Sequence, residues 1–260
     1  MNILVVLKMV PDVVEELEVA QDGKALDTEF LRLILSESDD HALEQAILLK
    51  ERHGGTVTVL AMDAPEIDDA LYTALAKGAD RAMKVTADEP GLGTRAAANI
   101  LAEIIRADES LSRADLILTG TQALDDLDGL VAPIIAQSLG RPYLGIVTAV
   151  APDGAKSVTV VKEYPGSVRG EFDVALPAVL GIQAAEKPPR YVPVAKVRAA
   201  MKSQKIGTAE VPTMADGGCR LVEVLALSKP VVSGQAEMLE GDAGEVSAKL
   251  CEILASRGLL

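Results

Sequence analysis

The feature that most constrains the fold of this chain is the alternation of short apolar runs with amphipathic segments before residue 140. Each apolar run is long enough for a strand buried on both faces of a sheet, and each amphipathic segment has apolar residues at steps of three and four. Strands that alternate with helices in this way form a parallel sheet covered by helices on both faces. We predict strands at 3–7, 56–61, 81–85 and 116–118, and helices at 38–53 with Ser38 as N-cap, 65–76, 94–106 and 128–139.

A second group of apolar runs follows residue 140. Pro-Asp-Gly at 152–154, Pro-Gly at 165–166 and Pro177 separate these runs, and all three are typical turn sequences. The last run is suited to rejoin the parallel sheet. We predict strands at 146–150, 157–161, 168–174 and 178–182. The expected fold class is therefore α/β, with a doubly wound, mostly parallel, Rossmann-like sheet.

The chain changes character at residue 186, where prolines and glycines begin to interrupt it. About fifty residues with so little periodicity do not belong inside a compact domain, so we expect an extended arm that either lies on a partner or is disordered. Asp242 and Glu245 then have the spacing of a capping box before a final amphipathic helix, which favours docking. We divide the chain into an α/β domain at 1–185 and a C-terminal arm with a terminal helix at 186–260.

Composition excludes several classes of function. A formal net charge of −14 disfavours nucleic acid and anionic membrane surfaces as partners, because both attract clustered Lys and Arg. Cys219 and Cys251 are too few for a disulfide framework, and with His41 and His53 they form no metal-ligand spacing. The N-terminal apolar run stops at Lys8, and no apolar run approaches the ~18 residues of a membrane span. We expect a soluble, cytoplasmic protein without membrane insertion.

Residues 114–133 form the most informative stretch of the chain. A buried strand ends at Gly120, a polar and acidic loop follows, and a helix begins near Asp128 or Gly129 with Pro133 in its first turn, where proline is tolerated. A strand, a glycine-bearing loop and a helix N-terminus together form a common anion site, because free N–H groups and the positive end of the helix dipole point at one spot. Gly120 and Gly129 would allow the backbone to approach a phosphate closely.

The same stretch has a second interpretation. Asp125, Asp126 and Asp128 are good capping residues and would satisfy the first N–H groups of the helix without any ligand. The local sequence does not distinguish a ligand site from a self-capped helix.

The basic residues of this acidic chain gather in the arm, where Glu186 is their one acidic neighbour. A solvated charged face is one explanation, and a docking segment for an acidic partner is the other. We favour docking because the segment is also irregular. The basic residues are Lys187, Arg190, Lys196, Arg198, Lys202 and Lys205.

Several segments together carry a resemblance to a known family. They are residues 3–8, the Ser-Glu-Ser-Asp-Asp helix entry at 36–46, Thr-Ala-Leu-Ala-Lys-Gly-Ala-Asp-Arg at 73–81, Gly-Thr-Gln-Ala-Leu-Asp-Asp at 120–126, Leu-Pro-Ala-Val at 176–179 and Pro-Arg-Tyr at 189–191. In order and spacing they resemble the β subunit of electron transfer flavoproteins, and the long C-terminal tail is similar to the longer-tailed branch of that family.

This resemblance implies an adenine-nucleotide-binding fold and a specific role. Such a β subunit pairs with an α subunit that holds most of the redox FAD, and it binds AMP or, in electron-bifurcating members, a second FAD. The complex carries electrons singly from flavin dehydrogenases to a quinone oxidoreductase or another acceptor. The resemblance implies no catalytic or metal-binding residues on the β subunit itself.

The resemblance also implies where ligands and partners bind. The arm from Arg190 to Lys205 matches the family's recognition segment for dehydrogenases, with Val194 at the position of an apolar anchor. The implied nucleotide contacts are Val6, Ser36, Glu37, Ser38, Asp39, Met62, Gly120, Thr121, Gln122, Ala123, Leu124, Asp125, Asp126, Leu127, Asp128, Gly129, Leu130 and Val131.

Three alternatives remain open at this level. AMP-binding members have a polar Asn-Gln-Thr-Gly sequence where this chain has Gly129, Leu130, Val131 and Ala132. Val131 and Pro133 match the pattern of bifurcating members, but the Thr and Gln of that pattern are missing. Ser38 replaces a bulky residue that is often found close to the flavin. A stress-type ATP-binding module of the same architecture is the third alternative, but its glycine-rich phosphate loop is missing after Leu118.

Overall fold

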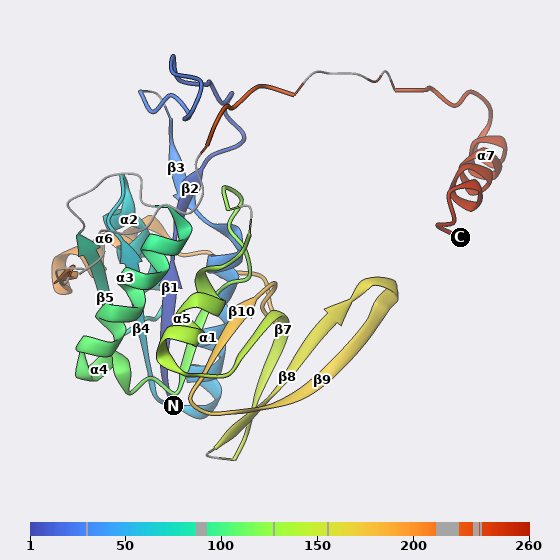
Figure 1. Cartoon of the computed structure of the whole chain (residues 1–260). Helices are drawn as coiled ribbons and strands as arrows, with labels where there is room; N and C mark the ends of the chain where they lie inside the picture. Colours follow the sequence, from blue (N-terminus) through green and yellow to red (C-terminus); the bar gives the residue numbers. More distant parts are fainter. Residues whose placement is uncertain are drawn as a thin grey trace.

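A computed structural model describes residues 1–29, 31–86, 93–126, 128–154, 156–211, 224–230, 234 and 236–260. Within these ranges, nine strands form one sheet in the order β11-β5-β4-β1-β6-β10-β7-β8-β9 (Figure 1). The strands are β1 (Asn2–Leu7), β4 (Thr56–Met62), β5 (Arg81–Thr86), β6 (Leu116–Gly120), β7 (Tyr143–Asp153), β8 (Ser157–Tyr164), β9 (Val168–Ala175), β10 (Ala178–Ile182) and β11 (Gly207–Glu210).

The sheet is mostly parallel, as the sequence predicts. Strand β1 pairs in parallel with β4 and with β6, and β10 continues the parallel pairing beyond β6 and joins β7. Strands β7, β8 and β9 pair antiparallel and project from the body as a long ribbon (Figure 1). The predicted doubly wound α/β fold is confirmed, including the return of residues 178–182 to the main sheet.

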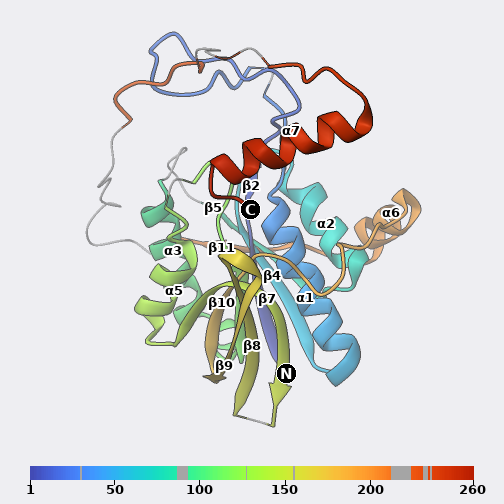
Figure 2. The same cartoon turned by 90° about the vertical axis from the view of Figure 1, so that its right-hand side faces the viewer.

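Helices cover both faces of the sheet (Figure 2). Alternate residues of β1 point to opposite sides, so Ile3, Val5 and Leu7 pack with α1 and α2, whereas Leu4 and Val6 pack with α3 and α5. All five side chains are buried, as expected for a central parallel strand. The helices are α1 (Glu37–His53), α2 (Ile67–Lys77), α3 (Thr94–Ala107), α4 (Glu109–Ser112), α5 (Val131–Leu139), α6 (Val194–Ser203) and α7 (Ala243–Ser256).

Two predicted helix starts are wrong. Helix α1 begins at Glu37 with Ser36 as its N-cap, so Ser38 lies inside the first turn rather than at the cap. Helix α5 begins at Val131 and not near Asp128, because Gly129 has a φ of +60°, which a right-handed helix does not allow. Pro133 still lies in the first turn of α5, where its missing N–H has no helical partner.

The arm is more regular than the sequence predicts. Helix α6 packs against α2, and β11 extends the main sheet by pairing in parallel with β5. The expectation of irregular structure is therefore wrong for residues 194–210, where Val197 and Ala200 contact the core. The division of the chain at residue 186 stays a prediction.

The terminal helix forms as predicted. The Asp242 side chain accepts hydrogen bonds from the N–H groups of Gly244 and Glu245, and the Glu245 side chain accepts one from the N–H of Asp242, which completes the capping box. No residue of α7 is buried, and the helix stands apart from the sheet in Figure 1. A short two-stranded sheet, β2 (Met9–Pro11) with β3 (Leu33–Leu35), connects β1 to α1.

Candidate functional site

The predicted site lies at the carboxyl ends of β1 and β6. From β1 the chain passes to β4 and β5 on one side and then returns to β6 on the other, so the winding of the sheet reverses between β1 and β6. Ligands of doubly wound sheets bind outside the carboxyl ends of the strands at this point. A small cavity of about 30 Å³ is found there. Its lining residues are Val6, Leu7, Lys8, Asp39, Thr119, Gly120, Thr121, Gln122, Ala123, Asp126, Gly129 and Val131.

Half of the predicted contact residues line this cavity. They are Val6, Asp39, Gly120, Thr121, Gln122, Ala123, Asp126, Gly129 and Val131. The other predicted residues that the structure describes do not line it: Ser36, Glu37, Ser38, Met62, Leu124, Asp125, Asp128 and Leu130. Leu127 lies outside the described residues.

Asp39 connects the two strand ends. Its Oδ2 accepts a hydrogen bond from the backbone N–H of Lys8 across 2.9 Å, and its Oδ1 accepts one from the N–H of Gly120 across 2.6 Å. The side chain is buried, and burial raises the pKa of Asp39 to about 7 even though both N–H groups favour the carboxylate. The first turn of α1 is thereby fixed to the ends of β1 and β6.

Gly120 allows the first turn of α1 to pack closely on β6. A Cβ at this position would lie 2.2 Å from Ser38 Oγ and 2.6 Å from Asp39 Oδ1. The glycine is therefore required for contact between helix and strand, and its predicted part in phosphate binding stays a prediction. Ser38 Oγ also donates a hydrogen bond to the Gln122 carbonyl across 3.0 Å.

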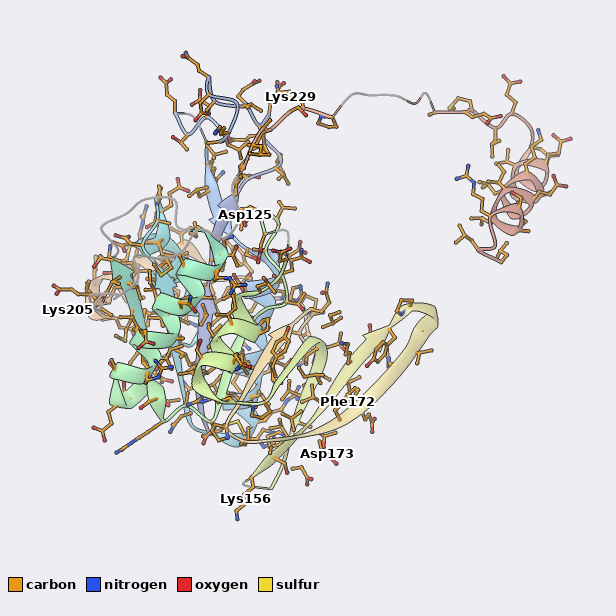
Figure 3. The ribbon with its side chains drawn as sticks, in the orientation of Figure 1. Asp125, Lys156, Phe172, Asp173, Lys205 and Lys229 are labelled. Atoms are coloured by element: carbon orange, nitrogen blue, oxygen red, sulfur yellow. The ribbon has the colours of Figure 1, made fainter. Side chains whose placement is uncertain are left out.

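The self-capping interpretation of the acidic loop is wrong within the described residues. Leu130 is the N-cap of α5, and no side chain there accepts a hydrogen bond from the helix. Asp126 Oδ1 instead accepts hydrogen bonds from the Thr94 hydroxyl and the N–H of Asp128, both across 3.2 Å. Asp125 forms an ion pair with Lys8 across 2.6 Å above the strand ends (Figure 3). The positive end of the α5 dipole thus faces the cavity without an acidic cap.

Comparison with known proteins identifies the family of the chain. A family model described as "Electron transfer flavoprotein domain" matches residues 26–215. Several relatives named electron transfer flavoprotein subunit beta align over nearly the whole chain. The chain belongs to the electron transfer flavoprotein β-subunit family.

Similar proteins from several organisms align over nearly the whole chain. The relative from Syntrophomonas wolfei is 32% identical over 253 residues, which cover 97% of this chain and 95% of the relative. The relative from Thermoanaerobacterium thermosaccharolyticum is also 32% identical and covers 100% of both chains. The relative from Methylophilus methylotrophus is 28% identical over 98% of both. A role in electron transfer follows from membership of this family.

The donors at the crevice fit the phosphate of the nucleotide that an electron transfer flavoprotein β subunit would hold. The uncapped start of α5 offers N–H groups, and Lys8 supplies a half-exposed ammonium group at the same mouth. The space for the nucleoside is small, because a cavity of about 30 Å³ holds only one or two water molecules.

A larger cavity of about 280 Å³ lies at the opposite edge of the sheet, at the amino ends of the strands. Its lining includes Asn2, Thr58, Arg81 and Arg113. The uncapped start of α5 and the reversal of strand order occur at the smaller cavity and not at this one.

Three residues that line the cavity were not predicted from the sequence. They are Leu7, Lys8 and Thr119, and Lys8 also forms the ion pair with Asp125. Their position in the sequence could have indicated that they line the cavity, since each lies at or next to the carboxyl end of a predicted central strand. No group of three or more His, Cys, Asp and Glu side chains in the described part of the chain is placed to hold a metal ion.

The basic arm separates into two groups. Arg190 forms ion pairs with Glu44 and Glu51 of α1, so it contributes to the internal structure and is not available for a partner. Lys196, Arg198, Lys202 and Lys205 are exposed. None of these four forms an ion pair with another residue in the described ranges. Lys205 lies at the outer edge of the molecule (Figure 3).

Among the described residues, no helix combines the length and the apolar character that crossing a membrane would require.

Proposed function

We propose that this chain is the β subunit of a heterodimeric electron transfer flavoprotein and that it binds AMP in the crevice between β1 and β6. The complex would carry electrons from flavin dehydrogenases to a downstream acceptor, with the redox FAD held mainly by the α subunit. The observation that carries the proposal is the uncapped N-terminus of α5 at the reversal of strand order.

The chain's own part in this function is binding. The N–H groups at the start of α5 would hold the phosphate of AMP, and Lys8 would add a charged contact when it turns from Asp125. Asp39 would keep the ends of β1 and β6 together beneath the nucleotide. FAD supplies the one-electron chemistry when it is bound to the complex.

Two parts of the C-terminal arm would meet partners. Helix α7 exposes Leu250, Ile253 and Leu254, and an exposed apolar face of this kind is suited to the α subunit. Helix α6 exposes a basic surface with Val194 at its start, and this surface is suited to an acidic flavin dehydrogenase.

Co-expression with an α subunit tests the proposal. We expect the isolated chain to be colourless and the complex to show the visible absorbance of bound FAD. We also expect deletion of residues 241–260 to abolish complex formation while the α/β core still folds. A truncated chain that pairs at full affinity, or an isolated chain that binds one equivalent of FAD, would contradict the proposal.

A further inference from the structure

The root of the arm, residues 185–190, is attached to one face of α1 by polar side chains. The α1 residues involved recur at helical spacing along one side of the helix, whereas Ala42, Leu43 and Ala46 of the same helix enter the core. The attaching residues are His41, Glu44, Gln45, Glu51 and Arg52.

Arg190 forms the centre of this attachment. Its Nε lies 3.0 Å and its Nη2 lies 2.9 Å from Glu44 Oε1, and its backbone N–H donates to Glu44 Oε2 across 3.0 Å. Its Nη1 donates to Glu51 Oε1 across 2.5 Å. Glu44 has only 3% of its side chain exposed, so this carboxylate depends on Arg190 for compensation. The hydrogen bond to Arg190 also holds the pKa of Glu51 below its usual value.

A second set of contacts holds Ala185 and Glu186. The Gln45 side chain accepts a hydrogen bond from the Glu186 N–H and donates one to the Glu186 carboxylate, both across 3.1 Å. Arg52 donates to the same carboxylate across 2.7 Å, and His41 Nδ1 accepts a hydrogen bond from the Ala185 N–H across 3.1 Å. The chain is therefore fixed over its length from residue 185 to Arg190.

The basic helix begins directly after this attachment. Helix α6 starts at Val194, and Val197 and Ala200 pack onto the core beside α2. This packing turns Lys196, Arg198 and Lys202 toward solvent. The apolar contact of α6 is small, since Ala200 is its one buried residue. Helix α6 is held on its C-terminal side by β11, which pairs with β5, and on its N-terminal side by the attachment at Arg190.

We infer that Arg190 is a positioning residue: its clamp on Glu44 and Glu51 fixes the basic surface of α6 for encounter with the electron donor. The inference rests on the proposed function, in which that surface meets a flavin dehydrogenase. A guanidinium suits the role because its planar fork contacts two carboxylates at once, which a lysine ammonium cannot reproduce.

The test uses Glu44→Gln and Arg190→Lys in the full heterodimer, with Lys187→Gln as the matched control. Lys187 is an exposed basic residue of the same segment that makes no hydrogen bond or ion pair with Glu44 or Glu51 in the described structure, although its charge is near enough to act on Glu51. We expect trypsin cleavage after Lys196, Arg198 and Lys202 to become about tenfold faster in both clamp variants, because proteolysis follows the population of the open form. Cleavage after Arg113, FAD content and heterodimer formation should stay unchanged, which excludes general unfolding.

The second readout is the rate constant for reduction of the heterodimer by a flavin dehydrogenase that reduces the wild type. We expect this second-order rate constant to fall about tenfold in the clamp variants, whereas the reduction rate at saturating dehydrogenase should stay normal. In Lys187→Gln the rate constant should stay near that of the wild type. Unchanged cleavage in α6 would overturn the inference, and so would faster cleavage with unchanged reduction. If Arg190→Lys behaves as wild type while Lys187→Gln slows reduction, charge alone matters and positioning is excluded. If no dehydrogenase reduces the wild type, the proposed function fails. The cleavage result then shows by itself whether Arg190 holds α6 in position.

Discussion

The carboxylate of Asp39 accepts a hydrogen bond from the backbone N–H of Gly120 across 2.6 Å, although the two residues are 81 positions apart in the chain. The second carboxylate oxygen accepts the N–H of Lys8. One buried side chain at the start of α1 therefore joins the ends of the two strands between which the nucleotide is proposed to bind. The first predictions concern this contact.

The pH dependence of stability should report the burial of Asp39. An unfolded aspartate titrates near pH 3.9, whereas the pKa of Asp39 in the folded chain is about 7. Between these values the folded state binds more protons than the unfolded state, so its stability falls as pH rises. Relative to Asp39→Asn, the free energy of unfolding of the wild type should fall by about 2–3 kcal/mol from pH 5 to pH 8, at 1.36 kcal/mol per pKa unit. Denaturant titrations at both pH values measure this difference, and a difference independent of pH would contradict the prediction.

Gly120→Ala should destabilise the fold by about 1–3 kcal/mol, because the added Cβ would overlap Ser38 and Asp39. Adding Ser38→Gly removes the closest of these atoms and should restore part of the loss. Gly234→Ala is the control, since a Cβ at that position would meet no atom within 4 Å. Thermal unfolding of the three variants measures the effect. Equal stability of Gly120→Ala and the wild type would show that α1 moves away at little cost.

Val131→Thr should strengthen AMP binding. Val131 is the first residue of α5 and lines the cavity, so a hydroxyl there would face the phosphate. A hydrogen bond to a charged group contributes ~1.5–3 kcal/mol, which corresponds to about a tenfold or larger gain in affinity. Val131→Ala offers no hydroxyl and serves as the control. Calorimetric titration with AMP measures the affinity, and equal affinities of the Thr and Ala variants would place the phosphate elsewhere.

Charge reversal on α6 should slow encounter with the donor. Arg198→Glu combined with Lys202→Glu removes attraction from the exposed basic surface, and the reduction rate should fall most at low salt, since charges are screened beyond ~10 Å at 0.1 M. Arg106→Glu with Arg113→Glu changes the same charge at a distant site and controls for net charge. Stopped-flow reduction across a salt series measures the rates. Equal rates for both double variants at every ionic strength would exclude α6 as the encounter surface.

Local signals in the sequence predict much of the fold. Strands β1, β4 and β6 each contain an apolar run because both faces of their central residues are buried, and such runs are visible without any knowledge of their neighbours. The capping box at Asp242 and Glu245 involves residues three positions apart, so it can also be predicted from the sequence. The strand that ends at Gly120 and the helix that follows the loop could be predicted for the same reason.

Contacts between distant residues set the features that the sequence does not predict. Arg190 and Glu44 are 146 positions apart, so a basic residue in an irregular segment gave no sign of an internal ion pair. Helix α6 and β11 are short and depend on α2 and β5 for stability, and their own periodicity is weak. The start of α5 depends on the positive φ of Gly129, which the residue type permits but does not require.

The nucleotide content of the purified heterodimer tests the central claim most directly. The complex is denatured, and the released FAD and AMP are separated and quantified against the protein concentration. The account predicts one FAD and one AMP for each heterodimer. Two FAD and no AMP would instead indicate an electron-bifurcating member with a second flavin in the crevice. One FAD with no second nucleotide would contradict the account, because the crevice between β1 and β6 would then be empty in the working protein.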